Sequence, residues 1–110
     1  MEQPVQEDVL PTRWEVELEF VQSLANLNYL NYLAQNKYLD DLRFMSYLNY
    51  LYNYWSLPSN AKFLIYPNCL QILHLLLFSK DDYFKNHIVQ REFADTFMNQ
   101  MVENWQKDKI

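Results

Sequence analysis

The 110-residue chain contains no glycine. Glycine supplies the positive-φ turns and close backbone approaches that tight β-hairpins, dinucleotide fingerprints and phosphate-binding loops require. Its absence therefore excludes the P-loop and the dinucleotide-binding motif, and it disfavours a sheet built from tight hairpins. An all-helical domain is the fold that least needs glycine.

Positive charge, cysteine and long apolar runs are also scarce. The formal net charge is −5, whereas non-specific binding of DNA or RNA requires a basic surface that releases counterions. The single cysteine, Cys69, cannot form an internal disulfide, which fits a reducing compartment. The longest apolar run, residues 75–78, is too short to cross a bilayer, and residues 1–10 lack the apolar core of a signal peptide. We therefore predict no direct nucleic-acid partner and no membrane partner.

Few residues offer catalytic or metal-binding chemistry. His74 and His87, with one cysteine in the whole chain, do not match the spacing of a zinc site, and His74 in an apolar run is expected to be a hydrogen-bonded core residue. Cys69 lies near an expected helix start, where a thiol pKa can fall, but no partner base is predictable and a buried, inert cysteine is favoured. Glu15 and Glu19 share a helix face without a histidine or cysteine nearby. We predict no catalytic residue, no metal and no cofactor.

The stretch from Phe44 to Trp55 is the one around which the chain is organised. One helical stripe collects its apolar and large aromatic residues, namely Phe44, Leu48, Leu51, Tyr52 and Trp55. A second stripe, roughly 100° around the same helix, carries Tyr47, Tyr50 and Tyr54. A helix that is apolar or aromatic over most of its circumference is normally buried or covered by something else. Two interpretations stay open: a central core helix, or a partner surface on the tyrosine stripe.

The rest of the pattern predicts an all-α, compact, single-domain helix bundle with no sheet. Residues 1–11 are expected to be a flexible tail, and residues 12–107 the helical domain. The expected N-caps are the Thr12–Glu15 capping box, Asn26, Asp40 or Asp41, Asn68 and the segment 79–82. Residues 61–66 form a short apolar element of uncertain type, in which one or two helical turns are favoured. The last helix shows the most regular stripe, made of Ala94, Phe97, Met98, Met101, Val102 and Trp105.

Several blocks of the sequence resemble one known family. Residues 13–26, RWEVELEFVQSLAN, are similar to the Mediator complex subunit 31 (SOH) family, and the likeness continues through residues 28–35, the Tyr-Leu repeats at 47–51 and residues 66–70. The resemblance covers roughly residues 12–78. It implies a small, all-helical, non-enzymatic subunit in the middle module of the nuclear Mediator coactivator, which links activators to RNA polymerase II. It also implies pairing with the proline-rich N-terminal region of Mediator subunit 7, through its extended segment and helices, and association with other middle-module subunits.

The tyrosine stripe suits such a partner. A proline-rich strand lacks many N–H donors but keeps its carbonyls, so a tyrosine can stack on the proline ring and donate its hydroxyl to a carbonyl. Aromatic grooves bind such strands because the polyproline conformation is already low in entropy. We predict that Tyr47, Tyr50 and Tyr54 line or border the partner site, with Trp14 contributing from the first helix. The alternatives are that these rings pack within the chain, or that the protein is a free-standing adaptor for proline-rich peptides.

One departure from the family pattern lies in the central helix. The second Tyr-Leu pair is followed by two residues, Tyr52 and Asn53, before Tyr54 and Trp55, where the family has one. An extra residue turns everything after it by 100°. We consider two ways to absorb it, a π-bulge within the helix or a shift in the connection around Pro58. The bulge predicts that Trp55 still faces the core.

Overall fold

The protein is all-helical over the part that a computed structural model describes. That part comprises residues 10–109, with side chains described through Glu103, so most of the expected N-terminal tail and the side chain of Trp105 lie outside it. The elements are α2 (Arg13–Ser23), α3 (Leu27–Gln35), the 3-10 turn η1 (Tyr38–Asp40), α4 (Leu42–Trp55), α5 (Pro58–Ala61), α6 (Asn68–Phe78), the 3-10 turn η2 (Lys80–Asp82), α7 (Tyr83–His87) and α8 (Arg91–Lys109). No strand occurs among the described residues. The prediction of an all-α domain without a sheet is confirmed.

Three of the expected helix caps are present. Thr12 forms both halves of the capping box with Glu15, because its hydroxyl accepts from the Glu15 amide at 3.1 Å and its own amide donates to the Glu15 carboxylate at 2.9 Å. The side chain of Asn26 caps α3, and that of Asp41 caps α4. These caps satisfy backbone N–H groups that have no partner inside the helix. They therefore set where each of the first three α-helices begins.

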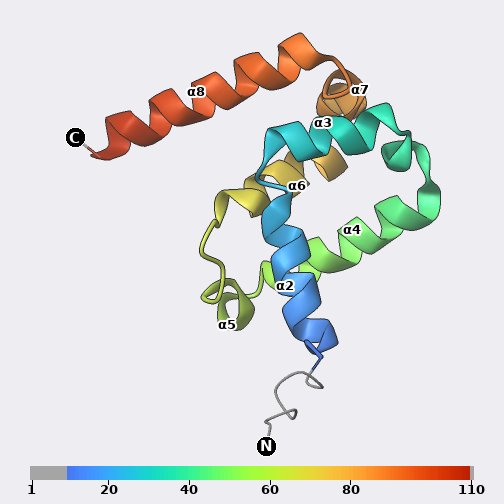
Figure 1. Cartoon of the computed structure of the whole chain (residues 1–110), viewed down its shortest axis with the longest axis vertical. Helices are drawn as coiled ribbons and strands as arrows, with labels where there is room; N and C mark the ends of the chain where they lie inside the picture. Colours follow the sequence, from blue (N-terminus) through green and yellow to red (C-terminus); the bar gives the residue numbers. More distant parts are fainter. Residues whose placement is uncertain (1–9, 110) are drawn as a thin grey trace, which may run out of the picture.

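The core is one cluster of buried side chains to which α2, α3, α4, α6, α7 and the start of α8 contribute, with α4 and α6 packed side by side (Figure 1). On α4 the fully buried side chains are Leu48, Leu51 and Trp55, which recur three and four residues apart. On α6 the buried residues are Cys69, Ile72, Leu73 and Leu76, and this helix packs against α2, α4 and α7. The apolar character of α6 on nearly all sides follows from having neighbours on several sides.

The π-bulge hypothesis for α4 is wrong. The helix runs from Leu42 to Trp55 as one α-helix without a π segment. Trp55 nevertheless faces the core, because it lies four residues after Leu51 on the same stripe. The alternative, a shift in the connection around Pro58, stays a prediction.

The connection from α4 to α6 corrects two further expectations. The helical turn in this region is α5, which begins at Pro58 and ends at Ala61, so residues 62–67 are irregular rather than a continuation of a helix. Proline at the first helical position is well tolerated, because its missing N–H would be unpaired there anyway. Asn68 is the first residue of α6 and not its cap, since Pro67 holds the cap position without a side-chain hydrogen bond.

The last helix extends well beyond the rest of the bundle (Figure 1). Its first turns pack on α3, where Ala94 is fully buried; just before α8 begins, the Ile88 carbonyl accepts from the side-chain amide of Asn31 at 2.8 Å. Val102, farther along, is 49% exposed. The expected stripe therefore packs against the core from Ala94 through Met101 and no longer does so at Val102. No helix in the described range is long and apolar enough to span a membrane.

In a chain without glycine, other residues occupy the left-handed backbone region. Lys37 has φ 67°, directly after α3, and Asp81 and Asp82 each have φ 56°. Aspartate tolerates this region better than a residue with a long side chain, because a short polar group can bond locally. Lys37 therefore carries strain that glycine would not.

Replacing Lys37 with glycine is expected to raise the free energy of unfolding by about 0.5–1 kcal/mol. This increase is the strain energy relieved at position 37, reduced by the larger conformational entropy that glycine gives the unfolded chain. Urea melts would measure it, with Lys37→Ala as the control, because alanine keeps the Cβ that causes the strain. An equal change in both variants would contradict the explanation.

Candidate partner interface

Tyr47, Tyr50 and Tyr54 form a continuous stack along one side of α4, which we call the tyrosine ladder. The ring centroids of Tyr47 and Tyr50 are 6.2 Å apart at an interplanar angle of 21°, and those of Tyr50 and Tyr54 are 6.3 Å apart at 24°. Tyr50 is 46% exposed, and the two flanking rings are partly buried. The three tyrosines expected from the sequence therefore lie together, with the middle ring the most open to solvent.

The first turns of α2 fix one end of the ladder. The hydroxyl of Tyr47 donates to Oε2 of Glu17 at 2.8 Å, and Nε of Arg13 donates to the same oxygen at 3.0 Å. Glu17 is only 7% exposed, and a carboxylate this buried requires such partners. The hydrogen bond and the negative charge of Glu17 raise the pKa of the Arg13 guanidinium. The sequence analysis missed Glu17, although its i, i+4 spacing from Arg13 is a detectable signal.

The environment of Tyr47 makes the free energy of unfolding decrease at alkaline pH. Burial, together with the hydrogen bond to Glu17, raises the pKa of Tyr47 from 10.0 to about 12. The folded protein therefore keeps this proton at a pH where the unfolded chain has lost it. The stability that Tyr47 contributes is fully present below pH 10 and is lost as the pH rises to about 12.

The variant Tyr47→Phe tests this dependence. At neutral pH we expect it to lower the free energy of unfolding by about 1–2 kcal/mol, because a hydrogen bond to a charged group is lost. The difference from the parent protein should shrink between pH 10 and 12. Chemical denaturation at several pH values would measure it, and a difference that stays constant over this range would contradict the assignment. The other tyrosines titrate in both proteins, so their contribution cancels in the difference between the two free energies of unfolding.

Trp14 lies beyond the other end of the ladder. Its ring is 5.5 Å from that of Trp55 and 5.1 Å, edge to face, from that of Phe63. Trp55 in turn lies 5.0 Å from Tyr54. The structure therefore links Trp14 to the ladder through the ring of Trp55.

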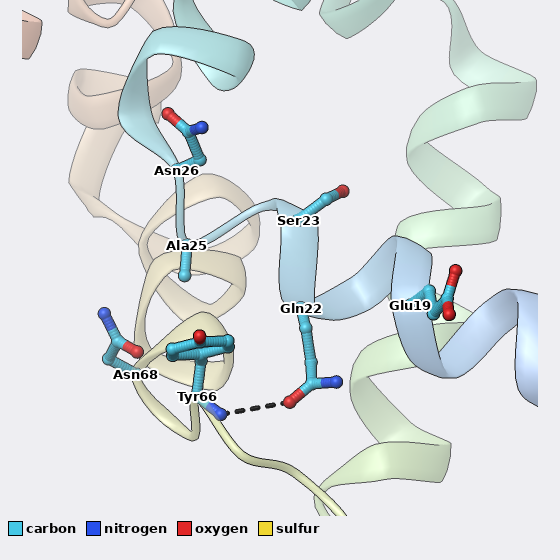
Figure 2. Close-up of a pocket in the computed structure, with 7 residues that line it drawn as sticks. All are labelled: Glu19, Gln22, Ser23, Ala25, Asn26, Tyr66 and Asn68. Atoms are coloured by element: carbon cyan, nitrogen blue, oxygen red, sulfur yellow. Dashed lines mark hydrogen bonds between the residues drawn. The ribbon is translucent and has the colours of Figure 1, made fainter.

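An open hollow lies on another part of α2, beside the start of α6. It measures about 520 Å³ and is lined by Glu19, Gln22, Ser23, Ala25, Asn26, Tyr66 and Asn68. In Figure 2 the side chain of Gln22 points toward Tyr66, and its oxygen accepts from the Tyr66 amide at 3.0 Å and also from the Ile65 amide. Glu19 points away from Tyr66. Gln22 thus anchors the irregular segment before α6, and most of this lining was not singled out from the sequence.

A second hollow of about 470 Å³ adjoins the first. Its lining is Val16, Glu19, Phe20, Ser23, Asn26 and Tyr29, so the two hollows share Glu19, Ser23 and Asn26. The four predicted site residues line neither hollow. The ladder is therefore not part of either of these two hollows.

Two expectations about reactive side chains have different outcomes. Cys69 is fully buried, and burial raises the pKa of its thiol to about 11, so the expected inert cysteine is confirmed. His74 is exposed, with its Nδ1 3.1 Å from the Tyr52 hydroxyl and its ring 5.1 Å from that of Phe78. The prediction of a core histidine was wrong, because His74 lies on the outer side of α6. The described residues contain no group of three or more side chains suited to hold a metal ion.

Comparison with known proteins gives a consistent result. A family model described as Med31, SOH1 matches residues 11–109. The chain is 56% identical over 99 residues to the Mediator of RNA polymerase II transcription subunit 31 of Candida albicans, an alignment covering 90% of this chain and 65% of the relative. It is 44% identical over 94 residues to the subunit of the same name from Schizosaccharomyces pombe, covering 86% and 65%, and 47% identical over 94 residues to that of Danio rerio, covering 86% and 66%. The chain thus spans just under two thirds of the length of these three relatives.

Proposed function

The chain belongs to the SOH1 (Med31) family, and we propose that it is a non-enzymatic, architectural subunit of the Mediator complex that supports transcription by RNA polymerase II in the nucleus. The observation that carries this proposal is the family match over nearly the whole chain, together with the printed names of the relatives. The chemistry of the described residues agrees with it. The sole cysteine is inert, and the most distinctive surface is an aromatic ladder rather than a cavity with reactive groups.

The ladder is proposed to bind the proline-rich N-terminal part of Mediator subunit 7. The stacked rings, 6.2 and 6.3 Å apart, provide an aromatic surface on which proline rings can pack, and Tyr50 is exposed enough to take part without rearrangement. The Tyr47 hydroxyl is already engaged by Glu17, so we assign Tyr47 a packing role. Tyr50 and Tyr54 are the residues proposed to donate to partner carbonyls.

A two-part experiment tests the proposal. The tagged chain is expressed in Candida albicans in place of the endogenous subunit, and proteins recovered with it from nuclear extract are identified. The purified chain is also titrated by calorimetry with a synthetic peptide that carries the proline-rich N-terminal sequence of Candida albicans Mediator subunit 7. We expect co-recovery of other Mediator subunits, including those of the middle module, and saturable binding of the peptide.

The two parts separate the competing functions. Recovery of Mediator subunits without peptide binding would keep the architectural function and reject the ladder as the site. Peptide binding without recovery of Mediator subunits would favour a free-standing adaptor. Failure of both, with a helical circular dichroism spectrum showing an intact fold, would reject the proposed function.

A further inference from the structure

Trp55 holds a buried hydrogen-bond donor that the fold does not use. The side chain is fully buried, and its Nε1 has no hydrogen-bond acceptor among the described residues. It is the only buried side-chain nitrogen or oxygen in the described part of the chain without a partner. Native proteins pair nearly all such groups, so an unpaired one requires an explanation.

The surroundings of Trp55 are aromatic. The ring of Trp14 lies 5.5 Å from it on one side, and that of Tyr54 lies 5.0 Å away, edge to face. Phe63 packs edge-on against Trp14 and is itself exposed over about half its surface. The partly exposed ring of Trp14 therefore covers part of the buried Trp55 ring.

The two outer rings of this cluster, Trp14 and Phe63, belong to different kinds of segment. Trp14 is the second residue of α2, and Phe63 belongs to the irregular segment between α5 and α6. Terminal helical turns and irregular segments open at lower free energy than core helices do. Trp55 belongs to the last turn of α4, whose preceding turns hold the buried Leu48 and Leu51. Phe63 thus lies in the kind of segment that opens most easily, whereas the Thr12–Glu15 capping box holds the turn that carries Trp14.

We infer that Trp55 is a subsite for a main-chain carbonyl of an extended, proline-rich partner, and that Trp14 and Phe63 move aside to open it. This inference rests on the proposed function and adds a residue that the ladder alone does not include. An extended chain that crosses Tyr54 comes directly to Trp55, because the two rings are in contact. A proline-rich segment offers carbonyls without competing N–H donors, and an indole N–H is a donor only. The displaced Trp14 ring then packs against a proline ring of the bound segment.

The test removes the N–H group and keeps the ring shape. In β-(3-benzothienyl)alanine, sulfur replaces the indole N–H with little change in size. The single cysteine at position 69 allows the full chain to be assembled by ligating a synthetic segment 1–68 to a segment 69–110. The same replacement at Trp14, whose ring is proposed to move without donating, serves as the matched control.

With the analogue at position 55, the dissociation constant for the proline-rich peptide should rise about three- to tenfold, the usual range for one lost hydrogen bond. The urea midpoint should stay the same or rise, because removing an unpaired buried donor does not weaken a fold. The control should change the affinity less than twofold. Unchanged affinity at position 55 would overturn the inference, and so would an equal loss in the control.

A second measurement does not depend on any variant. In the unmodified protein, saturation with the peptide should move the indole N–H resonance of Trp55 downfield as the new hydrogen bond forms. An unmoved resonance with saturated peptide would overturn the inference and show that the N–H is satisfied inside the chain, for instance by an aromatic face. If the unmodified chain does not bind the peptide, the proposed site fails and this subsite fails with it.

Discussion

Replacing Leu73 with alanine is expected to lower the free energy of unfolding by about 2–5 kcal/mol. Leu73 is 0% exposed and lies in the middle of α6, which packs against α2, α4 and α7. Truncation removes apolar contacts and leaves a cavity that helices on several sides cannot easily close. Urea denaturation followed by circular dichroism would measure the loss.

The matched control is Leu42→Ala, the same chemical change at the first position of α4. Leu42 is 83% exposed, so its variant should stay within about 0.5 kcal/mol of the parent. A loss below roughly 0.5 kcal/mol for Leu73→Ala would show that α6 is not core. Equal losses in the two variants would show that burial does not decide the effect.

Replacing Tyr50 with alanine is expected to weaken binding of the proline-rich segment by more than about 1–2 kcal/mol, the usual cost of truncating an aromatic anchor at an interface. Tyr50 is the central and most exposed ring of the ladder, so its loss removes stacking on both neighbours as well as contact with the partner. The Tyr50→Phe variant keeps the ring and should lose only the contribution of the hydroxyl. Calorimetric titration of each variant would give the affinities.

Tyr83→Ala is the control for exposure. This tyrosine is exposed to a similar degree on α7, at the other end of the bundle from the start of α2 (Figure 1). Its variant should bind the segment with unchanged affinity. Affinity for Tyr50→Ala within about 0.5 kcal/mol of the parent, with an intact fold, would reject the ladder as the site.

The sequence predicted the elements that depend on local chemistry. Thr12, Asn26 and Asp41 were expected as caps because their side chains can bond the first free amides of a helix, and all three do. The buried stripe of α4 followed from its period of 3.6 residues. Both signals lie within a few residues of one another, so no tertiary information was needed.

The features that were missed depend on how helices cross. Glu17 was not singled out from the sequence, because only the passage of α2 beside α4 buries it against Tyr47. His74 was placed in the core because its neighbours in sequence are apolar, but the outer side of α6 is open at that position. Val102 continues the stripe of α8 after the helix has passed beyond α3. Periodicity identifies an apolar face without showing how far a neighbouring helix extends along it.

The buried position of Cys69 has a practical consequence for measuring the opening of the fold. A thiol with no exposed surface and a pKa of about 11 cannot react with an alkylating reagent in the closed protein. Labelling must then proceed through molecules in which the start of α6 has opened and the thiol has regained its ordinary pKa near 8.5. Because the sequence contains one cysteine, the labelling rate reports only the openings that expose this one site. A ligand that binds only the closed form slows this rate in proportion to its occupancy, so one mass measurement over time gives a partner's affinity without any attached probe.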